Sequence, residues 1–120
     1  MHGLDDARRT IRELRPRLEA LVVVRADLTE LRADLDRSGY SRLGGLPEAK
    51  ALEARIFAEL ESFGEHGAQI RGWAPLLLDF PGDLGGEPVM WCWLEGDTDI
   101  DWYHRVDCGF AGRRRVPPLG

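Results

Sequence analysis

The sequence is poor in the residues that build many functional sites, and it has no long apolar run. It contains no asparagine, a single lysine (Lys50), two cysteines and three histidines. The formal net charge is -5, so the chain has no general attraction for nucleic acid or for anionic membranes. The apolar run Leu21–Val24 is followed by Arg25, and both it and the six-residue run Val89–Leu94 are far too short to span a bilayer. We therefore expect neither a nucleic-acid partner nor a membrane partner.

The two cysteines, in a chain without a secretory signal pattern, indicate a reducing cytoplasm. A disulfide between Cys92 and Cys108 is geometrically conceivable if their strands pair in register, but a cytoplasmic location disfavours it. Cys92 can equally be a small buried hydrophobic residue. The expectation is a cytoplasmic protein with free thiols.

Length and composition predict one globular domain. A chain of 120 residues is long enough to bury a core. Its 43% hydrophobic and 31% charged residues are typical of a folded protein and not of a disordered one. We predict a single domain over residues 1–120.

Residues 4–37 carry the pattern of a long amphipathic helix. Apolar residues recur at alternating spacings of three and four, which is the seam of a helix with coiled-coil character. Arg25 interrupts the seam, and Pro16 is expected to kink or restart the helix because proline lacks an N–H group. The seam consists of Leu4, Ala7, Ile11, Leu14, Leu18, Leu21, Leu28, Leu31 and Leu35.

Residues 47–63 predict a second helix, about half as long as the first at about 1.5 Å per residue. Pro47 suits its first turn, and Gly64 is positioned to end it. The break between the helices is short, so they should form an antiparallel hairpin. The Leu4–Leu14 half of the first helix then needs the sheet, or a second copy of the chain, as its partner. The apolar positions of the second helix are Ala49, Leu52, Ile56, Phe57, Leu60 and Phe63.

Residues 73–107 predict a three-stranded antiparallel meander, and residues 108–120 a C-terminal loop and tail. The middle strand is apolar on both faces and must be covered on both sides. The helical hairpin can cover one face, which leaves the other to the tail or to a partner subunit. The fold class is therefore α+β, and we expect a homodimer through the long N-terminal helix. The predicted strands are residues 73–80, 87–95 and 100–107, with turn chemistry at 81–86.

The last third also contains short motifs in a particular order. They are LDFP at 78–81, GEPV at 86–89, CW at 92–93, EGD at 95–97, YHRVD at 103–107 and GFAGR at 109–113. In this order they resemble the closing segment of the bacterial domain-of-unknown-function 2203 family, and the opening LDDARRTIRELRPRL is similar to its start. That family has no established activity. The resemblance therefore implies a fold and a chain boundary, and no reaction.

His104 is the first candidate site residue. It lies on the apolar face of the third strand and could act as a general base or as a metal ligand. Alternatively, it is a core histidine whose ring nitrogens bind backbone or a carboxylate, and the lack of a nearby nucleophile favours this interpretation. Cys92, Asp107 and Cys108 could join it in a soft metal site. No CxxC or HxxxH pattern occurs, and adjacent strand residues face opposite ways, so we expect no bound metal and no cofactor.

Asp79 and Arg113 complete the candidates. Asp79 could be a catalytic acid or base, or it could fix the end of its strand by accepting hydrogen bonds, with Arg105 or Arg113 as its partner. Arg113 closes the GFAGR stretch, which could hold an anion on its amides or form a turn that tucks Phe110 into the core. The tryptophans and residues 113–115 could stack on bases, but the acidic balance favours an aromatic core.

Two classes of function stay open. In the first, the protein is a non-catalytic, self-associating cytoplasmic module, which the helical seam and the missing catalytic constellation favour. In the second, it binds a small ligand or a metal, or is an enzyme. The site would then be formed by Asp79, Cys92, His104, Asp107 and Arg113. The sequence favours the first class and leans against an enzyme.

Overall fold

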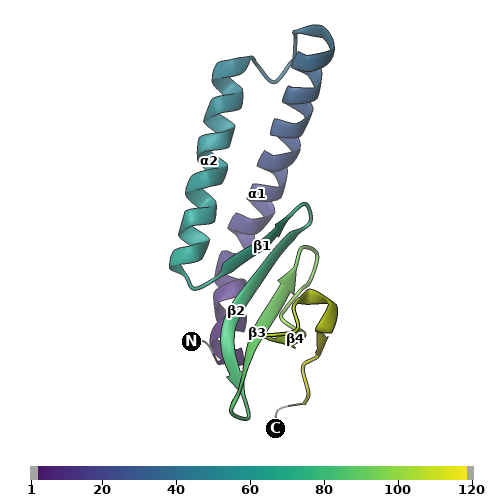
Figure 1. The fold of residues 1–120 in the computed structure, drawn as a ribbon. Helices are drawn as coiled ribbons and strands as arrows, with labels where there is room; N and C mark the ends of the chain where they lie inside the picture. Colours follow the sequence, from purple (N-terminus) through teal and green to yellow (C-terminus); the bar gives the residue numbers. More distant parts are fainter. Residues whose placement is uncertain (1–2, 119–120) are drawn as a thin grey trace. The chain divides into compact units, whose positions relative to one another are not determined.

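The computed structural model describes residues 3–118, which form two long helices and a five-stranded antiparallel sheet (Figure 1). The α+β class is confirmed, and the prediction of three strands is wrong. Among the described residues, no helix has both the length and the apolar character that a membrane crossing needs. The elements are α1 (Leu4–Ser38), α2 (Leu46–Glu65), β1 (Gln69–Trp73), β2 (Leu76–Leu84), β3 (Glu87–Leu94), β4 (Trp102–Arg105), the 3-10 turn η1 (Phe110–Gly112) and β5 (Arg114–Arg115).

The chain divides into two compact units. One unit, Arg15–Ser62, contains most of the helical hairpin. The other joins the chain up to Leu14 to the chain from Phe63 onward, and it contains the whole sheet. The motifs of the last third therefore all lie in the unit with the sheet.

The hairpin unit has the antiparallel arrangement that the sequence predicts. Arg17 of α1 donates to Glu59 of α2 at 3.0 Å, and further along α1 Arg32 pairs with the earlier Glu53 of α2. The helix continues through Pro16, so it does not restart there. Within the unit, buried apolar residues of both helices form the core; they are Leu18, Leu21, Val24, Leu28, Leu31, Ala49 and Ile56.

Two details of the helices differ from the prediction. Phe57 does not join the seam of α2, because its neighbour Ile56 takes the buried position and leaves the Phe57 side chain 65% exposed. Gly64 does not end α2. The helix runs to Glu65, and Gly67 adopts the left-handed conformation (φ 93°) that allows the Ala68 N–H to bond the Phe63 carbonyl at 3.1 Å.

The first turns of α1 pack in the unit that contains the sheet. The side chains of Leu4, Ala7, Ile11 and Leu14 are all buried there. Arg8 Nε donates to the Ile100 carbonyl at 3.0 Å, which ties the helix to the chain before β4. The sheet is thus the partner of this half of α1 within a single chain.

The first predicted strand, residues 73–80, corresponds to the beginning of β2, and a strand that was not predicted precedes it. Residues 69–73 form β1, Ala74 and Pro75 form a turn joined by a cis peptide bond, and β2 begins at Leu76. Proline cannot donate to a strand ladder, so a turn is the favourable place for it. β1 has little apolar pattern and resembles a polar connection in the sequence. It also contains a bulge, because the register with β2 shifts between Ile70 and Gly72 and leaves Arg71 as the extra residue.

The predicted turn at 81–86 is mostly strand. β2 continues to Leu84 and pairs with β3 throughout, with Pro81 opposite Met90. Proline is tolerated at this point because β2 has passed the end of β1, so one side of the strand is unpaired. The turn itself is the pair Gly85–Gly86, with φ values of 60° and 88°, as a tight two-residue hairpin requires.

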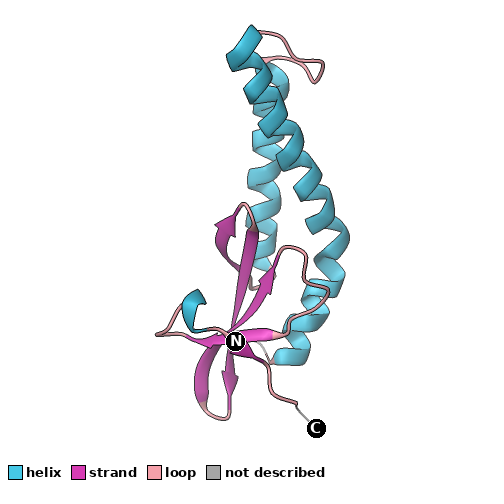
Figure 2. Cartoon of the chain, turned by 90° about the vertical axis from the view of Figure 1, so that its right-hand side faces the viewer, coloured by secondary structure: helices cyan, strands magenta, loops and turns pink. Residues whose placement is uncertain are grey.

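The sheet order is β1-β2-β3-β4-β5, and the two faces differ in character. β4 is shorter than the predicted third strand, since Val106 and Asp107 lie in a turn, and β5 pairs with its outer edge. Figure 2 shows the sheet between the first turns of α1 on one side and η1 on the other. One face carries the buried side chains of Leu76, Leu78, Phe80, Trp91 and Trp93.

Candidate functional site

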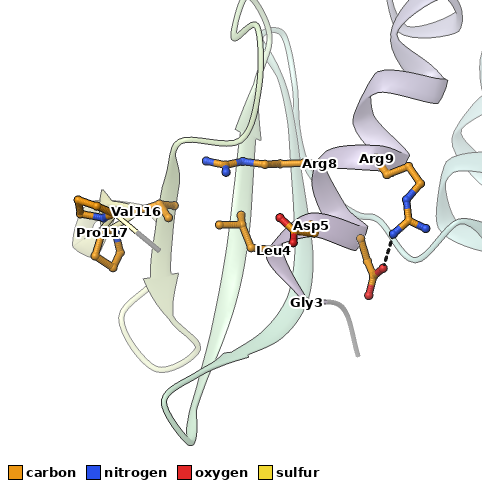
Figure 3. Close-up of a pocket in the computed structure, with 9 residues that line it drawn as sticks. Gly3, Leu4, Asp5, Arg8, Arg9, Val116 and Pro117 are labelled. Carbon is orange, nitrogen blue, oxygen red and sulfur yellow. Dashed lines mark hydrogen bonds and ion pairs between the residues drawn. The ribbon is translucent and has the colours of Figure 1, made fainter. Parts of the chain in front are cut away.

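A cavity of about 750 Å³ lies between the start of α1 and the C-terminal tail. Figure 3 shows Arg8 reaching from the helix toward the strands, while Arg9 points away and pairs with Asp6 at 2.7 Å. Arg8 is engaged by the Ile100 carbonyl and by Asp101. Both arginines are already paired within the chain, and the cavity lacks a buried polar atom without a partner among the residues that the structure describes.

The stronger candidate lies on the face of the sheet opposite the apolar one. The register places Asp79 of β2 opposite Cys92 of β3, and Cys92 opposite Trp102 of β4. His104 follows Trp102 by two residues and so points to the same face. The ligand atoms of Asp79, Cys92 and His104 all lie within 4.8 Å of one another, and all three residues are buried.

The ring of His104 is held at both nitrogens. Its Nδ1 lies 2.7 Å from the carbonyl oxygen of Arg105, an acceptor, so Nδ1 carries a hydrogen and donates it. In a neutral ring Nε2 is then an acceptor, yet it faces Asp79 Oδ2 at 3.1 Å. Two acceptors at this distance need a hydrogen or a cation between them. In the metal-free protein, a hydrogen on one of the two atoms makes this contact a hydrogen bond.

Asp79 keeps unused capacity for a ligand. Its Oδ1 is buried and makes no hydrogen bond to any residue that the structure describes. Its Oδ2 lies 3.7 Å from Nε of Arg71, whose side chain is 51% exposed. A buried carboxylate oxygen without a donor is costly, which makes this atom a preferred contact for a bound cation or donor.

Cys92 is not an activated nucleophile in this state. Burial raises the pKa of its thiol well above the ordinary value, and the hydrogen bond and negative charge of Asp79 raise it further. Nucleophilic cysteines need the opposite shift, because the thiolate is the reactive form. His104 cannot act as base in a Cys–His–Asp relay, because one ring nitrogen faces Asp79 and the other a backbone carbonyl.

A cavity of about 330 Å³ opens beside the cluster. Asp79 and His104 line it, whereas Cys92, only 1% exposed, does not. The rest of the lining combines one cation with apolar side chains and a glycine; these residues are Arg71, Leu77, Met90, Val106, Gly109 and Phe110.

The segment around η1 covers one side of this cavity. Gly109 has φ 67°, which favours glycine, and turns the chain so that Phe110 reaches the cavity. The guanidinium of Arg113 stacks over the rings of Trp102 and Phe110, at 4.5 Å from each centroid. The amides of Gly112 and Arg113 donate to Gly109 and Phe110 carbonyls, so they are not free to hold an anion. Phe110 is 44% exposed, so this stretch does not tuck it into the core.

The structure thus brings three of the five candidate residues together. Arg113 lies near them; burial and Asp79 raise the pKa of Cys92, and the positive charge of Arg113 opposes this shift without outweighing it. Asp107 lies outside the cluster, exposed and paired with Arg105 at 2.6 Å, and this hydrogen bond holds the pKa of Asp107 below its usual range. Cys108 is also exposed and is a free thiol.

Sequence reasoning missed Arg71 as a member of the site. It lies in β1, outside the three predicted strands, and follows Gln69, the register partner of Asp79, by two residues, so that it shares the face of Asp79. The partner expected for Asp79 was Arg105 or Arg113, whereas its observed partners are His104 and Arg71. An isolated arginine two residues after Gln69 has no distinguishing signal in the sequence.

Comparison with known families agrees with the motifs of the last third. Residues 1–116 match the uncharacterized conserved protein family known as domain of unknown function 2203. The chain belongs to this family. No curated protein and no solved structure matches it.

Proposed function

We propose that the protein binds a divalent transition metal of the zinc class through Asp79, Cys92 and His104. The observation that carries the proposal is the facing pair of acceptors. His104 Nε2 and Asp79 Oδ2 lie 3.1 Å apart, while Nδ1 of the same ring is committed to a carbonyl. A metal ion can take the place of the hydrogen between these two atoms and bind both of them.

The donor set suits zinc. Thiolate, imidazole and carboxylate are its usual protein ligands, and ligand atoms around tetrahedral zinc lie about 3.3–3.8 Å from one another. The three atoms here already lie within 4.8 Å, so a small contraction brings them to that spacing. Three protein ligands leave a fourth position, and Asp79 and His104 both face the adjoining cavity.

The surroundings also match those of a metal ligand. Metal-bound histidines usually donate their second ring N–H to a carbonyl or carboxylate, which fixes the ring and its tautomer. His104 does so through Nδ1 to the Arg105 carbonyl. The unpartnered Asp79 Oδ1 gives the carboxylate a second oxygen for the ion. This proposal reverses the preference that the sequence suggests, because the sequence does not show the convergence of the three residues.

Cobalt and zinc binding test the proposal. Protein stripped with chelator is titrated with Co²⁺, and a thiolate-to-cobalt charge-transfer band is recorded. Zn²⁺ affinity is then measured by competition with a chromogenic chelator. We expect one equivalent to bind, and Cys92→Ser to remove the charge-transfer band and weaken binding at least about tenfold. Cys108→Ser is the matched control, since this exposed thiol lies outside the cluster.

Two results would contradict the metal site. One is the absence of stoichiometric binding at micromolar protein. The other is a charge-transfer band that persists in Cys92→Ser and disappears in Cys108→Ser, which would assign the metal to the exposed thiol.

Self-association is a second function with narrower support. The sequence suggests that the Leu4–Leu14 half of α1 needs either the sheet or a second copy of the chain. In the structure, residues of the same chain already cover this half. The remaining support for a dimer comes from the hairpin unit, where two large apolar side chains are exposed. They are Val23, at 59% exposure, and Phe57, at 65%. We propose a homodimer in the bacterial cytoplasm, a reducing compartment that fits the two free thiols.

Light scattering on eluted protein tests the dimer. Wild type should elute as a dimer at micromolar concentration, and Phe57→Glu should shift it toward monomer because it places a charge in the contact. Glu61→Gln, also on the exposed surface of α2, serves as control. A wild-type monomer would rule out this function.

A further inference from the structure

We propose that the cavity beside the metal centre binds a small monocarboxylate with an apolar body, held between the metal and Arg71. This inference rests on the metal site proposed above. It concerns the ligand that the fourth coordination position receives.

The charge balance favours a single negative charge. A divalent ion bound by the Cys92 thiolate and the Asp79 carboxylate forms a neutral centre with His104. Arg71, whose Nε lies 3.7 Å from Asp79 Oδ2, then faces a carboxylate that the metal has already neutralised. One positive charge is left at the cavity, and a monoanion balances it.

Arg71 lies in β1 on the face that carries Asp79, because it follows Gln69, the register partner of Asp79, by two residues. Its side chain lines the cavity while remaining half exposed. Its Nη2 donates to Gln69, which orients the guanidinium and leaves its other donors for a ligand.

The apolar lining indicates the rest of the ligand. Leu77, Met90, Val106 and Phe110 surround the polar end of the cavity. Val106 and Phe110 are among the large apolar side chains most open to solvent, at 53% and 44% exposure, and both edge this cavity. A ligand with an apolar body would cover them. At about 330 Å³ the cavity is at the small end of ligand sites, which range from about 300 to 1,000 Å³.

Benzoate is a suitable probe because it joins one carboxylate to a compact apolar ring. The cobalt-loaded protein is titrated with benzoate while the visible cobalt spectrum is recorded, and benzamide, the neutral isostere, is titrated in parallel. We expect benzoate to change the spectrum with saturation in the micromolar to millimolar range and benzamide to leave it unchanged. Arg71→Gln should weaken benzoate at least about tenfold and leave cobalt affinity within about twofold. Arg55→Gln, an exposed arginine of the hairpin unit, removes the same charge elsewhere.

The outcomes separate the two proposals. If cobalt does not load, the metal site and this inference both fail. If cobalt loads but millimolar benzoate leaves the spectrum unchanged, the carboxylate inference alone is overturned. Equal benzoate affinities in Arg71→Gln and Arg55→Gln would likewise overturn it, because binding would then not depend on the cation in the cavity.

Discussion

His104 Nε2 lies 3.1 Å from Asp79 Oδ2, and this contact joins β4 to β2 across the intervening strand β3. Both residues are buried, at 5% and 3% exposure. The pair therefore has a structural role in the metal-free protein whatever it binds. The same geometry that holds the sheet together leaves two ligand atoms facing each other.

Asp79→Asn should preserve the fold while removing the metal ligand. The asparagine amide can donate to Nε2, which is an acceptor when Nδ1 donates to the Arg105 carbonyl. We expect its free energy of unfolding to stay within about 1 kcal/mol of wild type, and Asp79→Ala to cost about 2–3 kcal/mol by leaving Nε2 unpaired. Urea unfolding of chelator-treated protein measures both. An Asn variant as unstable as the Ala variant would contradict the assigned tautomer.

His104→Ala should destabilise the metal-free protein by about 1–3 kcal/mol, because it removes packing and leaves the buried Asp79 carboxylate without its main partner. The measurement is thermal unfolding of wild type and variant in one buffer with chelator. His66→Ala, an exposed histidine, is the comparison. A melting temperature equal to or above that of wild type would show that the ring lines a site without supporting the fold.

Arg113→Ala should loosen the segment that covers the cavity. The guanidinium stacks on Trp102 and Phe110, and a desolvated cation–π contact contributes about 0.5–2 kcal/mol. We expect faster hydrogen exchange at the Gly112 and Arg113 amides. Arg113→Lys should restore only part of the protection, since ammonium does not stack as a plane. Unchanged exchange in the alanine variant would mean that the 3-10 bonds alone hold the segment.

The sequence predicts the elements whose apolar period is strong. The α1 seam is buried as expected except at Leu35, which is half-buried, and Val24 fills the place that Arg25 interrupts. β3 is apolar on both faces and buried on both. β1 and β5 were not predicted because their residues are mostly polar or small. Both form strands only because the outer edges of β2 and β4 offer backbone groups with which they can pair.

The candidate site was predictable by residue type and not by arrangement. Asp79, Cys92 and His104 were singled out, but their convergence depends on a register in which Asp79 faces Cys92 and His104 lies one step along. The Gly85–Gly86 turn fixes the register between β2 and β3. The sequence predicts a turn at 81–86, whereas β2 continues to Leu84. Asp107 was grouped with them from its closeness in sequence, although the turn after β4 directs it to Arg105.

Asp99 links α1 to the loop before β4, and its ionisation should make stability depend on pH. Its Oδ2 pairs with Arg12 at 2.7 Å, and its Oδ1 accepts the Ile100 N–H at 2.9 Å. Partial burial raises the pKa of Asp99. The hydrogen bonds from Arg12 and from Ile100, with the charges of Arg12 and Arg8, outweigh burial and lower the pKa below the ordinary value of 3.8.

A lowered folded-state pKa means that the folded protein binds this proton less readily than the unfolded chain. The stabilisation is then fully present above the unfolded pKa and is lost as the pH falls through the folded pKa. Asp99→Asn should therefore reduce the free energy of unfolding by about 0.5–1 kcal/mol at pH 7, the range for a partly exposed ion pair. The difference from wild type should shrink below pH 4, because wild type then loses the charge as well. Asp36→Asn, an exposed residue of α1, controls for the general effect of removing one negative charge. Urea unfolding from pH 7 to pH 2 checks this, and a difference that stays constant over the whole range would show that the charge of Asp99 does not stabilise the fold.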